Sequence, residues 1–180
     1  KKKNAKSVIK NIEKRIKIKK INFFNKNILN KKNSFIFESV EKAKNRGRYT
    51  IFGFNPDLIL EVKKNNIYLN KRKIKNKQNP KNYLEKFINN FKFNLPNNLP
   101  KMSMMMAGYL GYDFIKYFEK IPDKNNDDLK IPDVKLIRPN FIYIHDNKLH
   151  KFFYIKISYN KNSSYEIELK NLKEQLKKDL

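Results

Sequence analysis

Short apolar segments separated by Asn- and Lys-rich stretches follow one another along most of the chain, and this pattern favours a sheet. Strands are expected at 21–24, 35–37, 48–54, 58–62, 67–69, 102–110, 134–137, 141–145 and 149–157. Asn, Asp and Pro favour tight turns, so we expect turns at 55–57, 65–66 and 146–147.

Other segments have apolar residues at helical spacing. Val8, Ile9, Ile12 and Ile16 predict a helix within 4–19, and a second helix is expected after Pro80. A short helix is expected after Asp113, and a last one over 165–180. The sum is an α+β fold, mostly antiparallel sheet with flanking helices, without an internal repeat or an obvious domain boundary.

The charge is extreme for a chain of 180 residues, with 42 basic and 17 acidic residues, a net charge of +25 and a pI near 10.0. Such a charge is typical of nucleic-acid-binding proteins. However, 37 of the basic residues are Lys and only 5 are Arg, the residue best suited to bidentate contacts with bases and phosphates. Lys is also spread along the whole chain, and Asn is abundant while Ala is scarce. Coding bias is the favoured explanation, and a nucleic-acid-binding module is kept as the alternative.

Several classes of protein and site are excluded by composition. The chain has no Cys, so it has no disulfide scaffold and no cysteine zinc site. Four Gly are too few for a phosphate-binding loop or a dinucleotide fingerprint. No apolar stretch approaches the roughly 20 residues of a membrane helix, and no secretory leader is visible. Because the chain begins with Lys1, we expect a fragment of a longer protein.

No catalytic constellation is visible from the residues alone. His145 and His150 flank a predicted hairpin turn, and we interpret both as solvated. Glu38 and Glu41 are three residues apart, so in an extended segment they point to opposite faces and cannot act together.

Two pairs of segments, in this order and spacing, resemble one known family. The first pair is SFIFESVE (34–41) and GRYTIFGFNPDL (47–58); the second is AGYLGYDFIKYFEKIPD (107–123) and DLKIPDVKLIRP (128–139). Together they resemble the N-terminal domain of anthranilate synthase component I over roughly residues 33–180, whereas residues 1–32 match only loosely. The large subunit of 4-amino-4-deoxychorismate synthase is the nearest alternative.

The resemblance implies a lyase of tryptophan biosynthesis that converts chorismate to anthranilate and pyruvate. It also implies Mg²⁺, ammonia supplied from glutamine by a glutamine amidotransferase subunit, a cytoplasmic location, and neither a nucleic acid nor a membrane as partner. In this family the chorismate and Mg²⁺ residues lie in a C-terminal catalytic domain, which we expect beyond Leu180. No catalytic or metal residue is therefore assigned to this chain.

The family's N-terminal domain contributes to the feedback site for L-tryptophan, which a Leu-Leu-Glu-Ser segment lines. The matching residues are Ile36, Phe37, Glu38 and Ser39, and Arg48 is the counterpart of a basic residue that faces the pocket in some members. Glu38 would pair with the ammonium group, Ser39 would hydrogen-bond and Arg48 would pair with the carboxylate. The alternative is that Ser39 ends one strand and Arg48 begins the next, both merely solvated. A stand-alone tryptophan sensor is a further hypothesis.

Gly108 and Gly111 are expected to allow close backbone packing. Tyr109 and Tyr112 are expected to fill the core or a domain interface.

Overall fold

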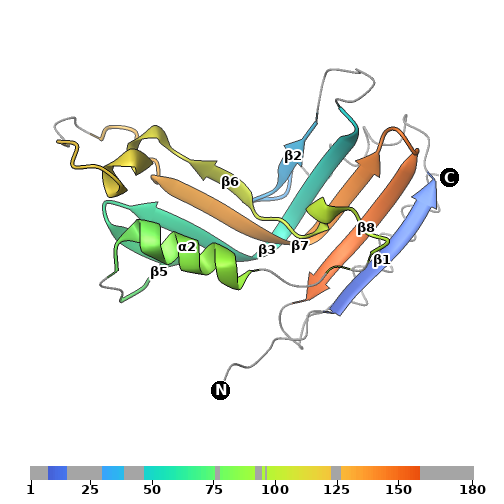
Figure 1. Cartoon of the computed structure of the whole chain (residues 1–180), viewed down its shortest axis with the longest axis horizontal. Helices are drawn as coiled ribbons and strands as arrows, with labels where there is room; N and C mark the ends of the chain where they lie inside the picture. The colour runs from blue at the N-terminus through green and yellow to red at the C-terminus, as the bar shows by residue number, and fades with distance from the viewer. Residues whose placement is uncertain are drawn as a thin grey trace. The chain divides into compact units, whose positions relative to one another are not determined.

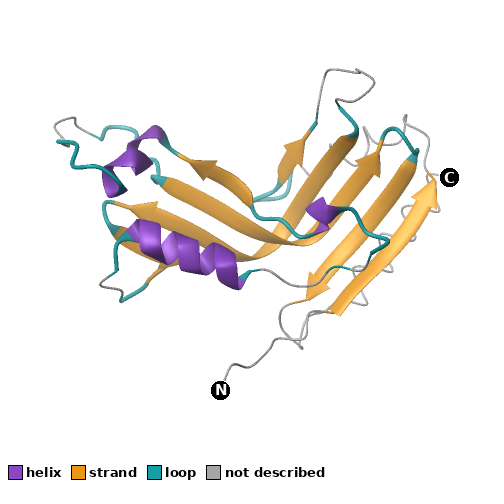
Figure 2. Cartoon of the chain, viewed as in Figure 1, coloured by secondary structure: helices purple, strands orange, loops and turns teal. Residues whose placement is uncertain are grey.

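The computed structural model describes residues 30–38, 47–75, 78–91, 95, 97–122 and 127–158, together with the backbone of 8–15. The strands are β1 (Val8–Arg15), β2 (Phe35–Phe37), β3 (Tyr49–Lys63), β4 (Asn66–Leu69), β5 (Arg72–Lys73), β6 (Ala107–Leu110), β7 (Val134–Asp146) and β8 (Lys151–Ser158). The helices are α2 (Pro80–Asn90) and the 3₁₀ helices η2 (Lys101–Ser103) and η3 (Tyr112–Tyr117) (Figures 1 and 2).

The eight strands of the described residues belong to one sheet with the order β1-β8-β7-β3-β4-β5, and β2 and β6 pair with β3 and β7. The pairs β1–β8, β2–β3, β3–β4, β4–β5, β6–β7 and β7–β8 are antiparallel. The predicted α+β class with mostly antiparallel sheet is thereby confirmed.

The chain divides into two compact units, one formed by residues 1–55 and 140–180 and the other by residues 56–139. Both divisions fall inside a strand, at Asn55–Pro56 in β3 and at Pro139–Asn140 in β7. The sequence does not predict these divisions, because no change of composition marks a boundary within a strand.

The first unit buries both faces of the β7–β8 hairpin. On one face, Phe54 stacks on Phe141 and Tyr143, with ring centroids 5.1 and 5.7 Å apart. Alternate residues of a strand point to opposite faces, so Ile142 and Ile144 lie on the other face, and both are fully buried. This two-sided burial explains why residues 141–144 of β7 are apolar without alternation.

The second unit packs α2 against its strands. Leu84 of α2 joins a buried cluster with Leu60 and Val62 of β3. The helix begins where the sequence predicts, because the Asn79 side chain accepts a hydrogen bond from the Lys81 amide (2.8 Å) and Pro80 follows the cap.

The helix predicted within 4–19 is wrong. Residues 8–15 form β1, which pairs with β8 from Val8↔Ser158 to Arg15↔Lys151. The apolar spacing fits a helix, but Val8, Ile9 and Ile12 are β-branched, and pairing with β8 satisfies the backbone hydrogen bonds.

The turn predicted at 55–57 is also wrong, because β3 runs through it. Asn55 adopts a positive φ of 51° within the strand. Asp57 is held on both sides: its carboxylate accepts from Arg138 Nε (2.8 Å), and its carbonyl accepts from Asn70 Nδ2 (2.9 Å).

The remaining expectations divide into three groups. The segments 134–137 and 141–145 form a single strand, β7, and of 102–110 only Ala107–Leu110 is a strand. The short helix expected after Asp113 exists as η3, but it begins one residue earlier, at Tyr112, and Gly111 is its N-cap. The strand at 21–24 and the helix at 165–180 lie outside the described residues.

Candidate functional site

Two of the three residues predicted to bind tryptophan lie at the same end of the β2–β3 ladder, in the first unit. The printed register ends at Phe37↔Ile51, so its continuation places Glu38 beside Thr50, two residues from Arg48. Ser39, the third residue, lies outside the described residues, as does Glu41.

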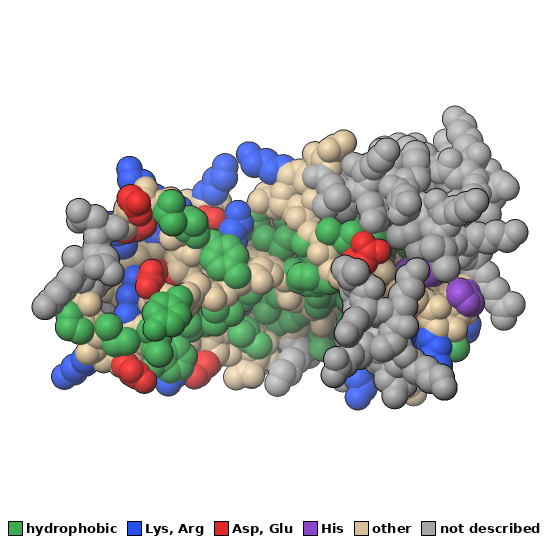
Figure 3. Space-filling view, turned by 90° about the horizontal axis from the view of Figure 1, so that it is seen from above, with side chains coloured by type: hydrophobic (Ala, Val, Ile, Leu, Met, Phe, Trp, Pro, Cys, Tyr) green, Lys and Arg blue, Asp and Glu red, His purple; other side chains and the backbone are tan. Residues whose placement is uncertain are grey.

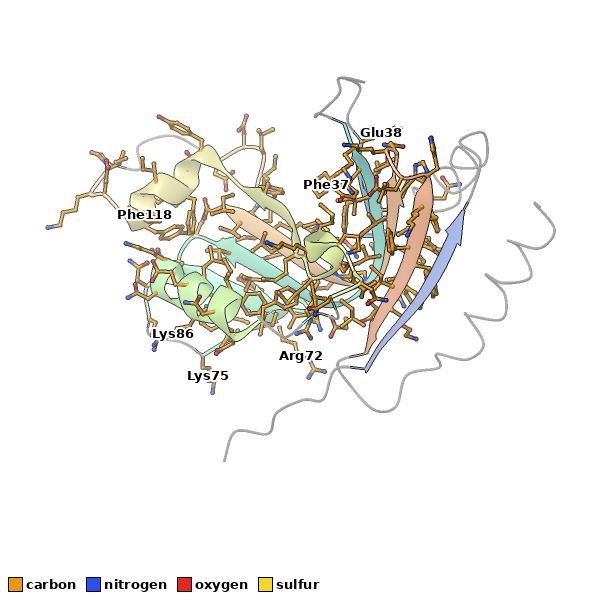
Figure 4. All side chains as sticks on the ribbon, turned by 45° about the vertical axis from the view of Figure 1, so that its right-hand side comes forward. Phe37, Glu38, Arg72, Lys75, Lys86 and Phe118 are labelled. Carbon is orange, nitrogen blue, oxygen red and sulfur yellow. The ribbon has the colours of Figure 1, made fainter. Side chains whose placement is uncertain are left out.

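Glu38 follows the last residue of β2 and is exposed (Figure 4). Within the described residues its carboxylate makes no hydrogen bond and no ion pair. Phe37 beside it is 46% exposed. The end of β2 thus offers an anionic group next to an uncovered ring.

Arg48, the residue that precedes β3, binds Asp146, the last residue of β7. Arg48 Nε lies 3.1 and 3.0 Å from the two carboxylate oxygens, and Nη2 lies 2.7 Å from Oδ2. The Asp146 side chain is 2% exposed, whereas that of Arg48 is 42% exposed. This is the bidentate arrangement in which Arg recognises a carboxylate best.

The charge state of the pair follows from its surroundings. Burial raises the pKa of Asp146, but hydrogen bonds from Arg48 and from the Leu149 and Lys148 amides outweigh burial and leave that pKa below its usual value. The hydrogen bond to Asp146 raises the pKa of Arg48. Both groups are therefore charged at neutral pH.

Asn147 reinforces the connection between β3 and the β7–β8 turn. Its amide donates to the Arg48 carbonyl (2.7 Å), and its Nδ2 donates to the Gly47 carbonyl (3.0 Å) and to Thr50 Oγ1 (3.3 Å). The sequence indicated only a turn at Asp146 and Asn147, because the partners of both residues are about a hundred positions away.

The prediction that His145 is solvated is wrong. The residue is 0% exposed, and neither ring nitrogen has a hydrogen-bond partner among the described residues. Burial is the main cause that lowers the pKa of His145, so the ring is neutral at pH 7. The residue lies in β7 opposite Phe152 of β8, in a two-sided core that the hairpin pattern did not reveal. His150, in the turn, is exposed as predicted.

The segment that begins at Ala107 shows why its glycines are needed. Gly108 has a φ of +154°, and a Cβ there would lie 1.9 Å from the Lys135 carbonyl oxygen. The close packing predicted at Gly108 is confirmed. Tyr109 and Tyr112 are 38% and 90% exposed, so a core role for them is wrong, and a role at a domain interface stays a prediction.

The described residues include no group of three His, Asp or Glu side chains able to hold a metal ion, so these residues do not fit a Mg²⁺ site. In the same part of the chain, no helix has both the length and the apolar character needed to cross a membrane.

Comparisons with known proteins give consistent results. Anthranilate synthase component 1 of Acetivibrio thermocellus is 30% identical over 138 residues, which are 73% of this chain and 28% of that protein. The protein of the same name from Cereibacter sphaeroides is 32% identical over 63% of this chain and 24% of its own length. The chain thus spans about a quarter of the length of the curated relatives it matches. No protein-family model matches.

The fold agrees with the sequence comparison. The crystal structure of anthranilate synthase component I from Streptococcus pneumoniae superposes with a TM-score of 0.58 at 24% identity, over 87% of this chain and 34% of that one. The curated relatives and the shared fold confirm the resemblance that the motifs predicted. Over the matched part of its length, this chain belongs to the anthranilate synthase component I family.

Proposed function

We propose that this chain is the N-terminal, regulatory part of an anthranilate synthase component I, the subunit that converts chorismate to anthranilate and pyruvate. The observation that carries the proposal is the 30% identity over 73% of the chain to a protein of that name. In this proposal Mg²⁺ and chorismate bind in a catalytic domain beyond residue 180. The described residues then serve to hold the feedback site and to pack against that domain.

The proposed feedback site for L-tryptophan contains Glu38, Ser39 and Arg48. Glu38 supports this proposal because its exposed carboxylate has no partner among the described residues and is thus available to an ammonium group. Arg48 is committed to Asp146 through Nε and Nη2, but its Nη1 makes no hydrogen bond with the described residues. One edge of a half-exposed guanidinium therefore remains for a ligand carboxylate, while Asp146 fixes its orientation.

Inhibition follows if tryptophan binds one arrangement of the regulatory and catalytic parts better than another. The network of Arg48, Asp146 and Asn147 would make the regulatory half of the pocket rigid. Tryptophan binding would then carry little entropic cost for ordering the strand ends. More of its binding free energy would be available to favour one packing of the two parts.

The proposed partner is a glutamine amidotransferase subunit that delivers ammonia, and the proposed location is the cytoplasm. Neither proposal assigns a contact to a described residue.

Complementation tests the proposed function. The complete reading frame that contains this chain is introduced into a bacterium that lacks anthranilate synthase component I and, separately, into one that lacks 4-amino-4-deoxychorismate synthase. We expect growth without tryptophan in the first strain and a continued need for 4-aminobenzoate in the second. The reverse result would assign the chain to the folate-pathway enzyme instead.

A further inference from the structure

The second unit contains a groove that includes none of the residues proposed to bind tryptophan. It is a hollow of about 470 Å³ between η3 and the segment 127–133. Its apolar lining includes Tyr112, Leu129 and Ile131, which are 90%, 73% and 57% exposed. Large apolar side chains gathered at one exposed place are a common mark of a protein interaction surface.

The rim of this groove is acidic although the chain as a whole is strongly basic. Asp113, Asp127 and Asp128 line it, are exposed, and form no ion pair within the described part of the chain. Lys64 and Lys116 also line the groove, but four Asp against two Lys give its lining an excess of negative charge, although the chain has only 17 acidic residues against 42 basic ones. On the left of Figure 3, acidic and basic side chains both lie among hydrophobic ones on the exposed surface.

The floor of the groove is held in place by hydrogen bonds. The Asp133 carboxylate accepts from Lys116 Nζ (2.9 Å) and from the Tyr117 hydroxyl (2.7 Å). The Asp133 carbonyl accepts from the Gly111 amide (2.8 Å), and the Asp133 amide donates to the Val62 carbonyl (2.8 Å). Both walls are therefore attached to one residue, so the groove is formed before any partner binds, which lowers the entropic cost of binding.

We propose that this groove is a docking surface for a partner protein segment that presents apolar side chains flanked by Lys or Arg. The apolar side chains would lie against Tyr112, Leu129 and Ile131. The cationic groups would pair with the rim carboxylates, which have no other ion-pair partner among the described residues. The surface goes beyond the proposed function, because it requires neither chorismate nor tryptophan.

Two synthetic peptides of 14 residues test this proposal. Both carry Leu at helical spacing, and one has Lys where the other has Glu at every polar position. Because the chain has a net charge of +25, non-specific attraction favours the Glu peptide. A preference for the Lys peptide therefore reports the local charge of the groove. Fluorescence anisotropy with the complete protein that contains this chain, near physiological salt, measures both affinities.

We expect the Lys peptide to bind at least about tenfold more tightly than the Glu peptide, which corresponds to about 1.4 kcal/mol. The double variant Tyr112→Ser/Leu129→Ser should lose this binding, and Asp127→Asn/Asp128→Asn should weaken it severalfold. Ile88→Ser removes a side chain that is 40% exposed on α2, and it serves as the control that leaves binding unchanged. Circular dichroism verifies that each variant folds, which is expected because the replaced side chains are exposed.

Equal or tighter binding of the Glu peptide, no binding of either peptide, or unchanged binding by both groove variants would overturn the proposal. Sedimentation velocity examines a different occupant. If the chain self-associates and Tyr112→Ser/Leu129→Ser abolishes this, a second copy fills the groove and the proposed basic partner is wrong. Complementation does not depend on these results, so the proposed function and the docking surface can fail separately.

Discussion

Arg48 and Asp146 are 98 positions apart, and their side chains form a bidentate ion pair that joins the start of β3 to the end of β7. Asp146 also accepts hydrogen bonds from the Lys148 and Leu149 amides (3.0 and 3.1 Å). One nearly buried carboxylate thus organises both the β7–β8 turn and the residue that precedes β3.

Replacing Asp146 should therefore destabilise the fold. Asp146→Ala leaves Arg48 and two turn amides without their acceptor, and we expect a loss of about 1–3 kcal/mol in the free energy of unfolding. Urea denaturation followed by circular dichroism measures this loss. Asp128→Ala removes an exposed carboxylate without an ion pair in the described part of the chain, and we expect a change within about 0.5 kcal/mol. Equal effects of the two substitutions would contradict the structural role of Asp146.

Stability should also depend on pH through His145. The unfolded chain binds a proton at this side chain below pH about 6.5, whereas burial lowers the pKa in the folded chain. Stability present above pH 6.5 is therefore lost as the pH falls towards the folded pKa, by up to about 1.4 kcal/mol per pH unit. Unfolding free energies measured between pH 7 and 5 should fall less steeply in His145→Phe than in the wild type.

The comparison isolates one ionisable group, because Phe keeps an aromatic ring in the core but cannot bind a proton. A wild-type slope equal to that of His145→Phe over this range would show that His145 is not buried in its neutral form.

Gly108 and Gly111 should differ in how much stability is lost when each is replaced by Ala. Gly108→Ala places a methyl group against the Lys135 carbonyl at a positive φ, and we expect a loss of about 1–3 kcal/mol. Gly111→Ala places its Cβ 3.3 Å from the Asp133 carbonyl oxygen, which a small shift accommodates. Thermal unfolding of both variants compares them, and a smaller effect at Gly108 than at Gly111 would be inconsistent with this β6–β7 pairing.

Local features could be predicted from the sequence. The helix after Asn79 and Pro80 depends on a cap and one apolar face, which neighbouring residues determine. The turn after Lys63 depends on two residues with positive φ, Lys64 and Asn65, which fit the predicted tight turn within one position. The antiparallel character of the sheet followed from many short apolar segments.

Features that depend on distant partners could not be predicted. Val8, Ile9 and Ile12 suit a helix as well as a strand, and only pairing with β8 selects the strand. Asp146 was visible as a turn residue but not as the partner of Arg48, because no local pattern connects positions 98 apart. Glu38 and Arg48 were predicted as site residues from the family resemblance, because the residues alone indicated no site.

Tryptophan inhibition tests the role of the β2 end. In the complete enzyme, Glu38→Gln should raise the tryptophan concentration for half inhibition by about 10- to 100-fold, because it removes a charge-assisted hydrogen bond. Ser39→Phe should abolish inhibition while activity without tryptophan is retained. Glu85→Gln, an exposed position on α2, is the control and should behave as the wild type. If both Glu38→Gln and Ser39→Phe were inhibited like the wild type, the β2 end would not be part of the tryptophan pocket.

The most direct measurement is the product that the complete protein makes from chorismate. The purified protein is incubated with chorismate, ammonia and Mg²⁺, and the products are separated and identified by mass. The proposed function predicts anthranilate and an equal amount of pyruvate, with anthranilate formation suppressed by L-tryptophan. Accumulation of 4-amino-4-deoxychorismate without release of pyruvate would contradict it.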